Sequence, residues 1–496
     1  MPSNELELSG EQFREMVNQA LERLVPLIDT LPEQRAADPS GAVELAHSLV
    51  EPVPQSGRPL PELLDLLFDK LIPKGFNTPG PGYLAYIPGG GLLESSLAEL
   101  ISTAVNRYVG VWAASPGLAQ LESNVVRWFN DIVGYPETAR GYLSSGGSMA
   151  NFSAVVTARR RLLGDDLTNA ALYCSDQCHH SVTKAAILAG FAPRTVRVVA
   201  TDSEFRLLPG ELRAMITRDR AQGKRPFLIA GSAGTTNTGA VDPLDELANI
   251  AQEEKLWFHV DGAYGAAFNM TERGARVLNG LSRSDSVSLD PHKALFLPYG
   301  TGCLLVRDGQ ALREAHSLTS AYMPQLQEDP LLVDFCEVSP ELSRSFRGLQ
   351  VWLPMKLHGI GAFRRQLDEK LELTDWTLGQ LEKLSDVEIL ARPNLTVIAF
   401  RFKRADLDLE MLNRLNQELL AEIVARGRVY LTPTWLYGKF VIRICILSYR
   451  THQDRLEMLM EDIEAGLAVV RERVDSRSKR SEGDLKHLDK NTLYKD

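Results

Sequence analysis

Between about residue 140 and about residue 300, short apolar segments alternate with longer amphipathic ones. Apolar runs without polar alternation are typical of strands that are buried on both faces, and apolar residues at helical spacing indicate helices. Strands and helices in alternation form a mostly parallel sheet covered by helices on both faces. The pattern predicts strands at 171–174, 195–200, 227–230, 256–260 and 286–289, and helices near 149–163, 180–189, 209–222 and 243–254.

The pattern changes toward both ends of the chain. Residues 1–90 have the spacing of amphipathic helices, which predicts a helical arm ahead of a large domain at 91–375. Residues 376–474 again combine strand-like and helical segments, so we expect a smaller α/β domain there. Residues 475–496 are charged and poor in large apolar side chains, which is typical of a disordered tail.

The composition is that of a globular protein, with 44% hydrophobic and 24% charged residues among 496. A formal net charge of -10 argues against a nucleic acid as the main partner. The first ten residues lack a basic region followed by an apolar core, so we expect no signal peptide. No stretch approaches the roughly 20 apolar residues of a membrane span. Five cysteines do not suggest a disulfide framework. We therefore expect a cytoplasmic enzyme with no membrane association.

Charged side chains follow two of the predicted strands directly. Asp261 comes after one, and Asp290, His292 and Lys293 come after another. Ligands bind at the carboxyl ends of strands in open α/β sheets. A lone lysine is most often a solvated surface charge, but a carboxylate after a buried strand is costly unless it is paired. A lysine and an aspartate at the same sheet edge therefore indicate a ligand site.

A glycine- and serine-rich loop at 144–148 precedes one of the predicted helices. Glycines let the backbone approach an anion, and the start of a helix offers unpaired N–H groups. Taken alone, the loop fits a helix cap as well as it fits a phosphate site. An amine, a carboxylate and a phosphate-binding loop together match the needs of pyridoxal phosphate, which we predict as the cofactor.

Two cysteines and two histidines lie close together at Cys174, Cys178, His179 and His180. A structural zinc site is not expected, because the second, distant pair of ligands is missing. We expect one of the histidines to lie flat against an aromatic cofactor; the alternative is a core or capping histidine. The segment 234–239 either supplies hydroxyl groups at the same edge or forms a plain turn.

These segments together resemble the group II pyridoxal-phosphate decarboxylases, the family of aromatic-L-amino-acid decarboxylase and glutamate decarboxylase. The matching segments occur in family order and cover most of the chain. They are Trp112-Ala113-Ala114-Ser115-Pro116 with Leu121-Glu122, Ser145-Gly146-Gly147-Ser148, Ser175-Asp176-Gln177 with His179, Gly234-Thr235-Thr236, His259-Val260-Asp261-Gly262-Ala263-Tyr264, Pro291-His292-Lys293 and Arg344-Ser345-Phe346-Arg347. The resemblance implies the α/β fold type I of pyridoxal-phosphate enzymes and a homodimer with active sites at its interface.

The resemblance also implies roles for single residues. Lys293 would form a Schiff base with the cofactor, Asp261 would pair with its pyridine nitrogen, and His179 would stack on its ring; these three are the expected catalytic residues. The other expected cofactor-binding residues are Gly147, Ser148, Thr236, Ala263 and His292. The expected substrate-pocket residues are Tyr86, Gly110, Trp112 and Phe335, and no metal is expected.

Two departures from the family pattern leave the reaction and the substrate open. Counting back from Arg344 places Phe335 at the family's loop tyrosine, which helps to protonate Cα, and a phenyl ring cannot donate a proton. In the family such a change is associated with oxygen-dependent conversion to an aldehyde, unless Tyr322 or His316 replaces the tyrosine. Gly110 stands where relatives with aromatic substrates carry a bulky apolar residue, so we expect it to widen the pocket.

The resulting prediction is decarboxylation of an L-amino acid, with aromatic ones favoured, to an amine and carbon dioxide. Three alternatives remain open: conversion to an aldehyde, a non-aromatic substrate, and a catalytically silent homologue that serves as a binding protein. The expected partners are a small amino-acid substrate and a second copy of the chain.

Overall fold

The structure, a computed structural model, describes residues 6–318, 329 and 331–489, with side chains as far as residue 476. The chain divides into one unit of residues 86–401 and 434–449, and another of residues 1–85, 402–433 and 450–496. Among the described residues, no helix is both long enough and apolar enough to cross a membrane.

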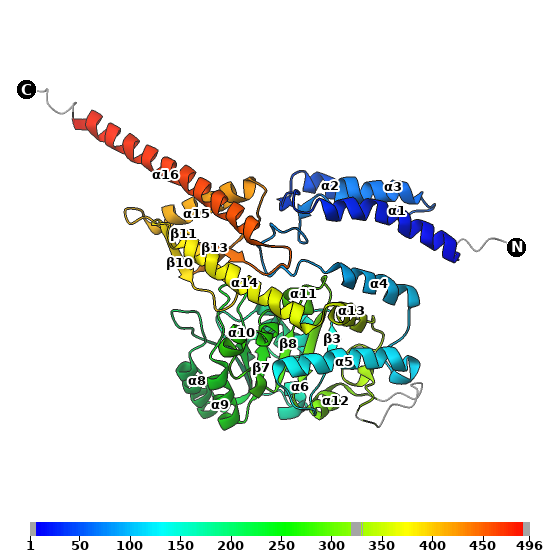
Figure 1. Ribbon diagram of the computed structural model, residues 1–496. Coiled ribbons are helices and arrows are strands. Elements are labelled where there is room, and N and C mark those ends of the chain that lie inside the picture. The colour runs from blue at the N-terminus through cyan, green and yellow to red at the C-terminus, as the bar shows by residue number, and fades with distance from the viewer. Residues whose placement is uncertain (1–5, 319–328, 330, 490–496) are drawn as a thin grey trace, which may run out of the picture. The chain divides into compact units, whose positions relative to one another are not determined.

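The larger unit is built on a seven-stranded sheet in the order β3-β9-β8-β7-β6-β4-β5. Figure 1 labels three of these strands, β3, β7 and β8. Each neighbouring pair from β5 to β8 is parallel, whereas β9 runs antiparallel to both β3 and β8. The predicted mostly parallel sheet is confirmed, and β9 is an addition that the sequence analysis did not anticipate. The strands are β3 Arg140–Ser144, β4 Ala170–Ser175, β5 Val196–Val199, β6 Arg225–Ser232, β7 Trp257–Asp261, β8 Ser286–Leu289 and β9 Gly302–Val306.

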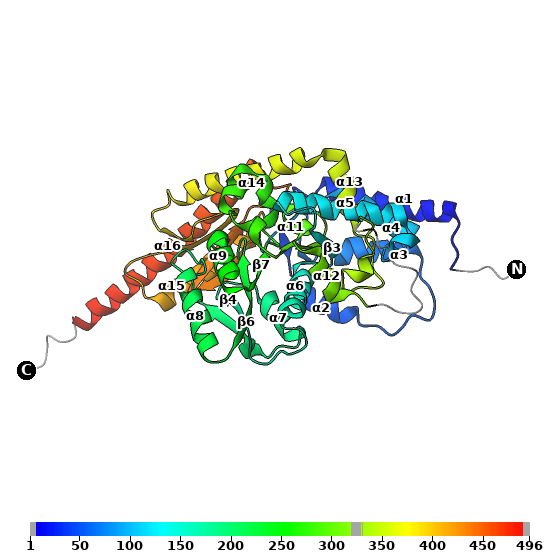
Figure 2. The same cartoon turned by 90° about the horizontal axis from the view of Figure 1, so that it is seen from below.

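Helices cover both faces of this sheet, which is why its strands read as continuous apolar runs. Leu172 and Cys174 of β4 pack into a core with α6 and α7, while Ala171 and Tyr173 between them pack into the core of the opposite face. Figure 2 shows α8 and α9 on one side of β4, β6 and β7, and α6 and α7 on the other. The helices of this unit are α4 Leu93–Val105, α5 Pro116–Val133, α6 Gly147–Leu162, α7 His180–Leu188, α8 Pro209–Ala221, α9 Leu244–Glu254, α10 Glu272–Val277, α11 Pro291–Ala294, α12 Gly309–His316, α13 Gly348–His358 and α14 Ile360–Leu381.

A second sheet follows late in the chain, in the order β10-β11-β13-β12. Its central pair, β11 and β13, is antiparallel, and both strands are buried along most of their length. These two central strands lie within residues 376–474, where the sequence predicted strand-like and helical segments. The strands are β10 Val387–Ala391, β11 Val397–Phe402, β12 Thr432–Leu436 and β13 Lys439–Cys445.

The other unit is mainly helical and begins with α1, Gly10–Asp29. The Ser9 hydroxyl accepts from the Gln12 N–H and the Gln12 side chain accepts from the Ser9 N–H, so a capping box fixes where α1 starts. The unit continues with β1 Ala37–Asp38, α2 Ala42–Ser48, α3 Leu60–Asp65, β2 Gly75–Phe76, α15 Leu409–Ala425 and α16 Gln453–Asp489. The predicted domain boundaries stay a prediction, as does the tail at 475–496, of which 490–496 lie outside the described residues.

Candidate functional site

The carboxyl ends of the parallel strands surround a cavity of about 270 Å³ in the larger unit. Parallel strands that share a direction bring the residues after them to one edge of the sheet. The register pairs Asp261 of β7 with Ser288 of β8, one residue before that strand ends. The cavity wall contains all eight residues expected to bind the cofactor: Gly147, Ser148, His179, Thr236, Asp261, Ala263, His292 and Lys293.

Asp261 is a buried carboxylate whose two oxygens are both hydrogen-bonded. One oxygen accepts from Nδ2 of Asn151 at 2.9 Å, and the other from the Ser288 hydroxyl at 3.1 Å and the Ala263 N–H at 3.2 Å. Burial raises the pKa of Asp261, but Lys293, two nearby histidines and the Asn151 amide outweigh burial and hold the pKa below its usual value. The side chain is therefore an anion at neutral pH, placed where it can pair with a cationic ring nitrogen.

A chain of hydrogen bonds supports this carboxylate from behind. The indole N–H of Trp257 donates to the Ser286 hydroxyl, which lies 2.9 Å from Nδ1 of His259. Nε2 of His259 lies 2.9 Å from Oδ1 of Asn151, whose amide then donates to Asp261. Because the indole can only donate and Oδ1 of Asn151 can only accept, the hydroxyl donates to Nδ1 and the proton of His259 lies on Nε2. Burial lowers the pKa of His259 to about 4, so this histidine is neutral.

His179 lies at the N-terminus of α7, where it caps the helix and lines the cavity. Its Nδ1 accepts from the Ser181 N–H at 3.3 Å and lies 2.7 Å from the Ser181 hydroxyl, so it caps the helix. Its ring also lines the cavity, and burial lowers its pKa. With Nδ1 as the acceptor, the neutral ring carries its proton on Nε2. Within the described residues no group of three or more His, Cys, Asp or Glu side chains is arranged to hold a metal ion.

Lys293 and His292 follow β8 on the short helix α11. Nζ of Lys293 lies 3.1 Å from Oδ2 of the buried Asp290. Nδ1 of His292 donates to the Thr301 carbonyl at 2.6 Å, and burial lowers the pKa of this ring too. The cavity therefore offers one primary amine beside two buried carboxylates, Asp261 and Asp290.

The loop at 144–148 leads from β3 directly into α6, which begins at Gly147. A side chain at Gly147 would come within 2.9 Å of Oδ2 of Asp290 and 3.0 Å of Cβ of Ala263. Glycine is thus needed for the close approach of these elements. The first N–H groups of a helix have no partner inside the helix, so the start of α6 can bind an anionic group such as a phosphate.

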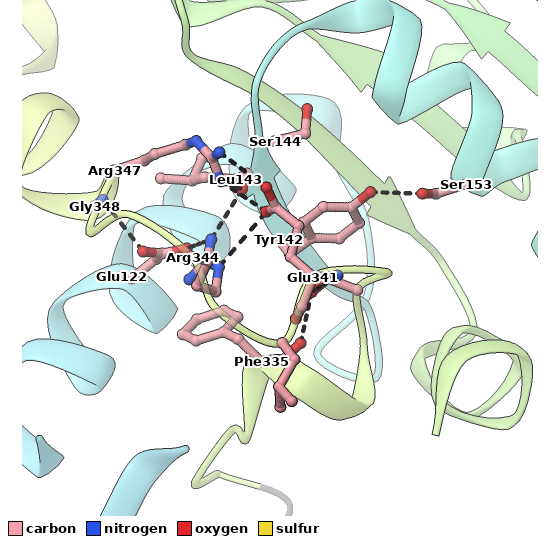
Figure 3. A network of polar contacts seen from close by, with 12 residues as sticks. Glu122, Tyr142, Leu143, Ser144, Ser153, Phe335, Glu341, Arg344, Arg347 and Gly348 are labelled. Carbon is pink, nitrogen blue, oxygen red and sulfur yellow. Dashed lines mark hydrogen bonds and ion pairs between the residues drawn. The ribbon is translucent and has the colours of Figure 1, made fainter. Parts of the chain in front are cut away.

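A second cluster of buried charges holds the end of β3 just before this loop (Figure 3). Nη2 of Arg344 donates to Oε1 of Glu122 at 2.5 Å and to the Leu143 carbonyl at 2.9 Å. Arg347 donates to the same carbonyl at 3.2 Å and pairs with Glu341. We call these side chains, Glu122, Glu341, Arg344 and Arg347, the arginine cluster. The cluster holds the backbone at the end of β3, just before the candidate phosphate loop.

Phe335 belongs to the surroundings of the arginine cluster and does not line the cavity. Its ring is fully buried, and the guanidinium carbon of Arg344 lies 4.7 Å from the ring centroid. This is the geometry of a cation–π contact. The side chain that was expected in the substrate pocket is thus part of the core in this chain.

Gly110 and Trp112 lie near the same segment. The Cys336 N–H donates to the Gly110 carbonyl, and a side chain at Gly110 would collide with Oη of Tyr108 at 2.4 Å and the Leu342 carbonyl at 2.8 Å. The room that Gly110 was expected to leave is therefore filled by Tyr108. The backbone N–H of Trp112 donates to Oδ1 of Asp334 at 2.6 Å. Neither Gly110 nor Trp112 is part of the cavity wall.

Tyr86 is exposed to 49% and has a φ of 50°, a conformation that is rare for a residue with a side chain. Buried Arg443 donates to the Tyr86 carbonyl at 3.4 Å and to the Asn237 carbonyl at 3.0 Å. Strained backbone of this kind persists where the surroundings hold it, and it is concentrated at functional sites. Tyr86 lies outside the cavity wall as well.

Tyr322 and His316 are the two candidate replacements for the loop tyrosine. Tyr322 lies outside the described residues. His316 ends α12, with Nε2 3.5 Å from the Thr157 hydroxyl of α6, and burial lowers its pKa to about 4. His316 is thus neutral and packed against α6, and it is not part of the cavity wall.

The sequence reasoning missed the residues that support Asp261, chiefly Asn151, Ser288, Ser286 and Trp257. Asn151 lies inside a helix and Trp257 inside a strand, where each reads as an ordinary structural residue. The available signal was spacing: Asn151 lies one helical turn beyond Gly147 and Ser148, and therefore on the same face of α6. The serines Ser286 and Ser288 also alternate along β8, which places both on one face of the sheet.

The residues present fit pyridoxal phosphate. The cavity provides an amine for an aldehyde, an ionised and fully hydrogen-bonded carboxylate for a ring nitrogen, and a helix start for a phosphate. Lys293, Asp261 and the N-terminus of α6 would hold these three parts of the cofactor.

Comparison with known proteins agrees with this fit. A family model described as the pyridoxal-dependent decarboxylase conserved domain matches residues 46–403. Aromatic-L-amino-acid decarboxylase from Bacillus atrophaeus is 35% identical over 469 residues, which cover 93% of this chain and 97% of that protein. Phenylacetaldehyde synthase from Petunia hybrida is 28% identical over 477 residues, which cover 91% of this chain and 93% of that protein.

A solved structure is similar along nearly its whole length. Catharanthus roseus tryptophan decarboxylase in complex with L-tryptophan superposes with a TM-score of 0.87 at 27% identity, covering 93% of this chain and 99% of that one. The matched domain, the identity to the bacterial relative and the geometry of the cavity all lead to one assignment. The chain belongs to the pyridoxal-dependent decarboxylases, enzymes whose cofactor is pyridoxal phosphate.

Proposed function

We propose that this enzyme removes the α-carboxylate of an aromatic L-amino acid and releases the amine and carbon dioxide. The observation that carries the proposal is the joint placement of the Lys293 amine and the ionised Asp261 carboxylate in one cavity beside the start of α6. Bound pyridoxal phosphate supplies a conjugated ring that accepts electrons when a bond to the substrate Cα breaks. The roles proposed for single side chains follow from their positions around that cavity.

Lys293 is the proposed covalent anchor of the cofactor, and the N–H groups of Gly147 and Ser148, together with His292, are the proposed phosphate ligands. Asp261 is proposed to keep the pyridine nitrogen protonated. Its pKa, held below the usual value, supports this role because the carboxylate stays ionised beside a cation.

His179 and Ala263 are proposed to lie against opposite faces of the cofactor ring, with Thr236 near its phenolic oxygen. His179 is neutral, with Nδ1 engaged by Ser181 and a proton on Nε2 that can donate to a substrate carboxylate. A carboxylate held out of the ring plane is lost most easily, because the electrons of its bond to Cα then overlap with the ring. The proposed task of His179 is to hold that orientation.

The preference for an aromatic substrate rests on the relatives, among them the bacterial aromatic-L-amino-acid decarboxylase and the plant structure that contains L-tryptophan. Tyr86 supports it as a half-exposed aromatic side chain on strained backbone. Arg443 is the residue that would favour a second substrate carboxylate, but it donates to the Tyr86 and Asn237 carbonyls. A non-aromatic amino acid remains the second candidate.

An amine is the proposed product, although the similar Petunia hybrida protein is named for an aldehyde product. The sequence argument for the aldehyde was a phenyl ring at Phe335 in place of a loop tyrosine. Because Phe335 is fully buried beneath Arg344, its ring gives no support to that argument. Tyr322 is the proposed proton donor to Cα, since His316 is neutral and packed against Thr157.

A homodimer in the cytoplasm is the proposed working form. An apolar stripe along α4 supports the dimer: Leu93, Leu97, Leu100 and Ile101 are each at least 40% exposed and recur at helical spacing. A second copy of the chain is the proposed cover. Light scattering should give twice the chain mass, and Leu97→Glu with Ile101→Glu should reduce it to one chain mass; a monomeric wild type would contradict the proposal.

Product analysis by mass spectrometry tests the proposed reaction. The protein, loaded with pyridoxal phosphate, is incubated with all twenty amino acids under air and under nitrogen. An aromatic amine formed equally in both atmospheres is the expected result. An aldehyde that forms only under air would replace the proposed product, an amine from another amino acid would replace the substrate, and absence of both product and cofactor absorbance would indicate a silent homologue.

A further inference from the structure

One buried carboxylate of the cavity has no role in the function proposed above. Asp290 directly follows β8 and is only 2% exposed. Its Oδ2 lies 3.1 Å from Nζ of Lys293 and 3.7 Å from Nε2 of His292. Its Oδ1 is buried and has no hydrogen-bond partner among the residues that the structure describes.

A structural role for this carboxylate is not apparent from its contacts. Asp290 occupies the N-cap position of α11, where an aspartate usually accepts from a backbone N–H, but its side chain makes no capping hydrogen bond. Burial of a carboxylate costs several kcal/mol unless a partner compensates for it, and here the partner is the ammonium group of Lys293. The side chain of Lys293 remains 25% exposed in the cavity wall, so the pair is open to a ligand.

The other acid–base groups around Nζ are already engaged. Asp261 accepts three hydrogen bonds, Nδ1 of His179 is held by Ser181, and Nδ1 of His292 donates to the Thr301 carbonyl. Asp290 is the carboxylate that combines direct contact with Nζ and an oxygen without a hydrogen-bond partner in the described part of the chain.

We propose that Asp290 is the catalytic proton carrier for covalent capture of the cofactor by Lys293. This inference rests on the proposed role of Lys293. Asp290 takes a proton from the Lys293 ammonium, and the resulting amine attacks the aldehyde carbon of pyridoxal phosphate. A C–N bond forms, the C=O π bond breaks, and one proton of the nitrogen passes to the oxygen, which leaves a hydroxyl group on that carbon. Asp290 then returns the proton to this hydroxyl, the C–O bond breaks, and water leaves.

The step balances without a further reactant. One ammonium and one aldehyde give one protonated C=N bond and one water, and the carboxylate is regenerated. No oxidant or reductant is involved. A carboxylate in contact with the reacting nitrogen is the geometry that general acid–base catalysis requires, and such groups typically contribute about a hundredfold or more in rate.

The test follows the rate at which the Schiff-base absorbance appears when the cofactor-free full-length chain is mixed with pyridoxal phosphate. Asp290→Asn keeps the shape of the side chain but cannot accept the proton. The rate should fall by about a hundredfold or more. Pyridoxine phosphate, which carries an alcohol in place of the aldehyde, is the matched probe, and its affinity should change by less than about twofold because no covalent bond forms.

Three results would overturn the inference. Asp290→Asn could form the absorbance band at the wild-type rate, or it could lose affinity for pyridoxine phosphate as strongly as it loses rate, which would make Asp290 a structural residue. It could also bind pyridoxine phosphate more tightly, which would mean that the carboxylate only opposes the phosphate. If Lys293→Ala kept the absorbance band, the proposed role of Lys293 would fail instead, and the two failures are distinguishable.

Discussion

The cavity and the arginine cluster both bury charged side chains next to the loop at 144–148, yet they are built differently. In the cluster, the side chains of Arg344 and Glu122 are both fully buried, and the guanidinium face lies on Phe335 (Figure 3). In the cavity, Asp290 is buried but Lys293 is 25% exposed toward an open space. A buried ion pair alone therefore does not mark a catalytic site in this protein; access from a cavity distinguishes the two regions.

The two regions also differ in their proposed relation to the cofactor. The cavity contains the groups proposed to contact the cofactor, whereas the arginine cluster holds the Leu143 carbonyl at the end of β3. Substitutions in the cavity should thus change chemistry with little loss of stability. Substitutions in the cluster should change stability and cofactor affinity together.

The largest effect is expected for Lys293→Ala. Removal of the amine should abolish the visible absorbance of the bound cofactor and reduce turnover to background, while the melting temperature of the cofactor-free chain stays close to that of the wild type. Absorbance spectra measure the bound cofactor, product formation measures turnover, and thermal unfolding measures the melting temperature. Retention of the band together with turnover would mean that another residue anchors the cofactor.

Asp261→Asn should be next in size. The variant keeps the shape and several hydrogen bonds of Asp261 but loses the negative charge, so it should retain cofactor and lose about a hundredfold or more in kcat. Asn151→Ala, which removes only one hydrogen bond to Asp261, should have a smaller effect in the same direction. Near-normal turnover of Asp261→Asn would exclude a major electrostatic role.

Glu122→Ala tests the arginine cluster. It leaves the Arg344 charge buried without its carboxylate, which typically costs about 3–5 kcal/mol, and it should weaken cofactor binding because Leu143 precedes the phosphate loop. The matched control is Glu272→Ala, which breaks the exposed Arg276–Glu272 pair and should leave the melting temperature unchanged. Equal effects of the two variants would show that burial is not what makes the cluster important.

A pH titration of stability probes the chain of hydrogen bonds behind Asp261. Burial lowers the pKa of His259 from 6.5 to about 4 in the folded state. Between these two values the unfolded chain binds a proton that the folded chain does not, so the free energy of unfolding should fall as the pH drops, by roughly 3 kcal/mol at most. Urea unfolding at a series of pH values measures the free energy of unfolding of the wild type and of His259→Gln. The variant should lose less of this free energy as the pH drops. Identical pH dependence of the two proteins would contradict the role of His259.

The smallest effect on the reaction is expected for Phe335→Tyr. The new hydroxyl would be buried without a partner beneath Arg344, so the variant should lose about 1–3 kcal/mol of stability with no change in product. Tyr322→Phe is the matching substitution and should shift product from amine toward aldehyde under air. If Phe335→Tyr changed the ratio of aldehyde to amine, Phe335 would be part of the reaction after all.

The amino-acid sequence alone predicted the fold class and the residues that line the cavity. Its strands are buried on both faces, so they read as uninterrupted apolar runs, and the residues after them converge because parallel strands end at one edge. For this reason Lys293, Asp261, His179 and Gly147 could be assigned to a single site from their positions along the chain.

Only the tertiary structure showed how these groups are supported and what Phe335, Gly110 and Asp290 contact. Phe335 reads as a substitution in a loop, but packing against Arg344, nine residues later, puts it in the core. From the sequence, Gly110 was expected to widen the substrate pocket, but the side chain of Tyr108 fills that space. Asp290 reads as one more strand-end carboxylate, and only its distance to Nζ of Lys293 and its unpaired Oδ1 within the described residues single it out. Such facts depend on contacts across the fold, and local spacing along the chain cannot encode them.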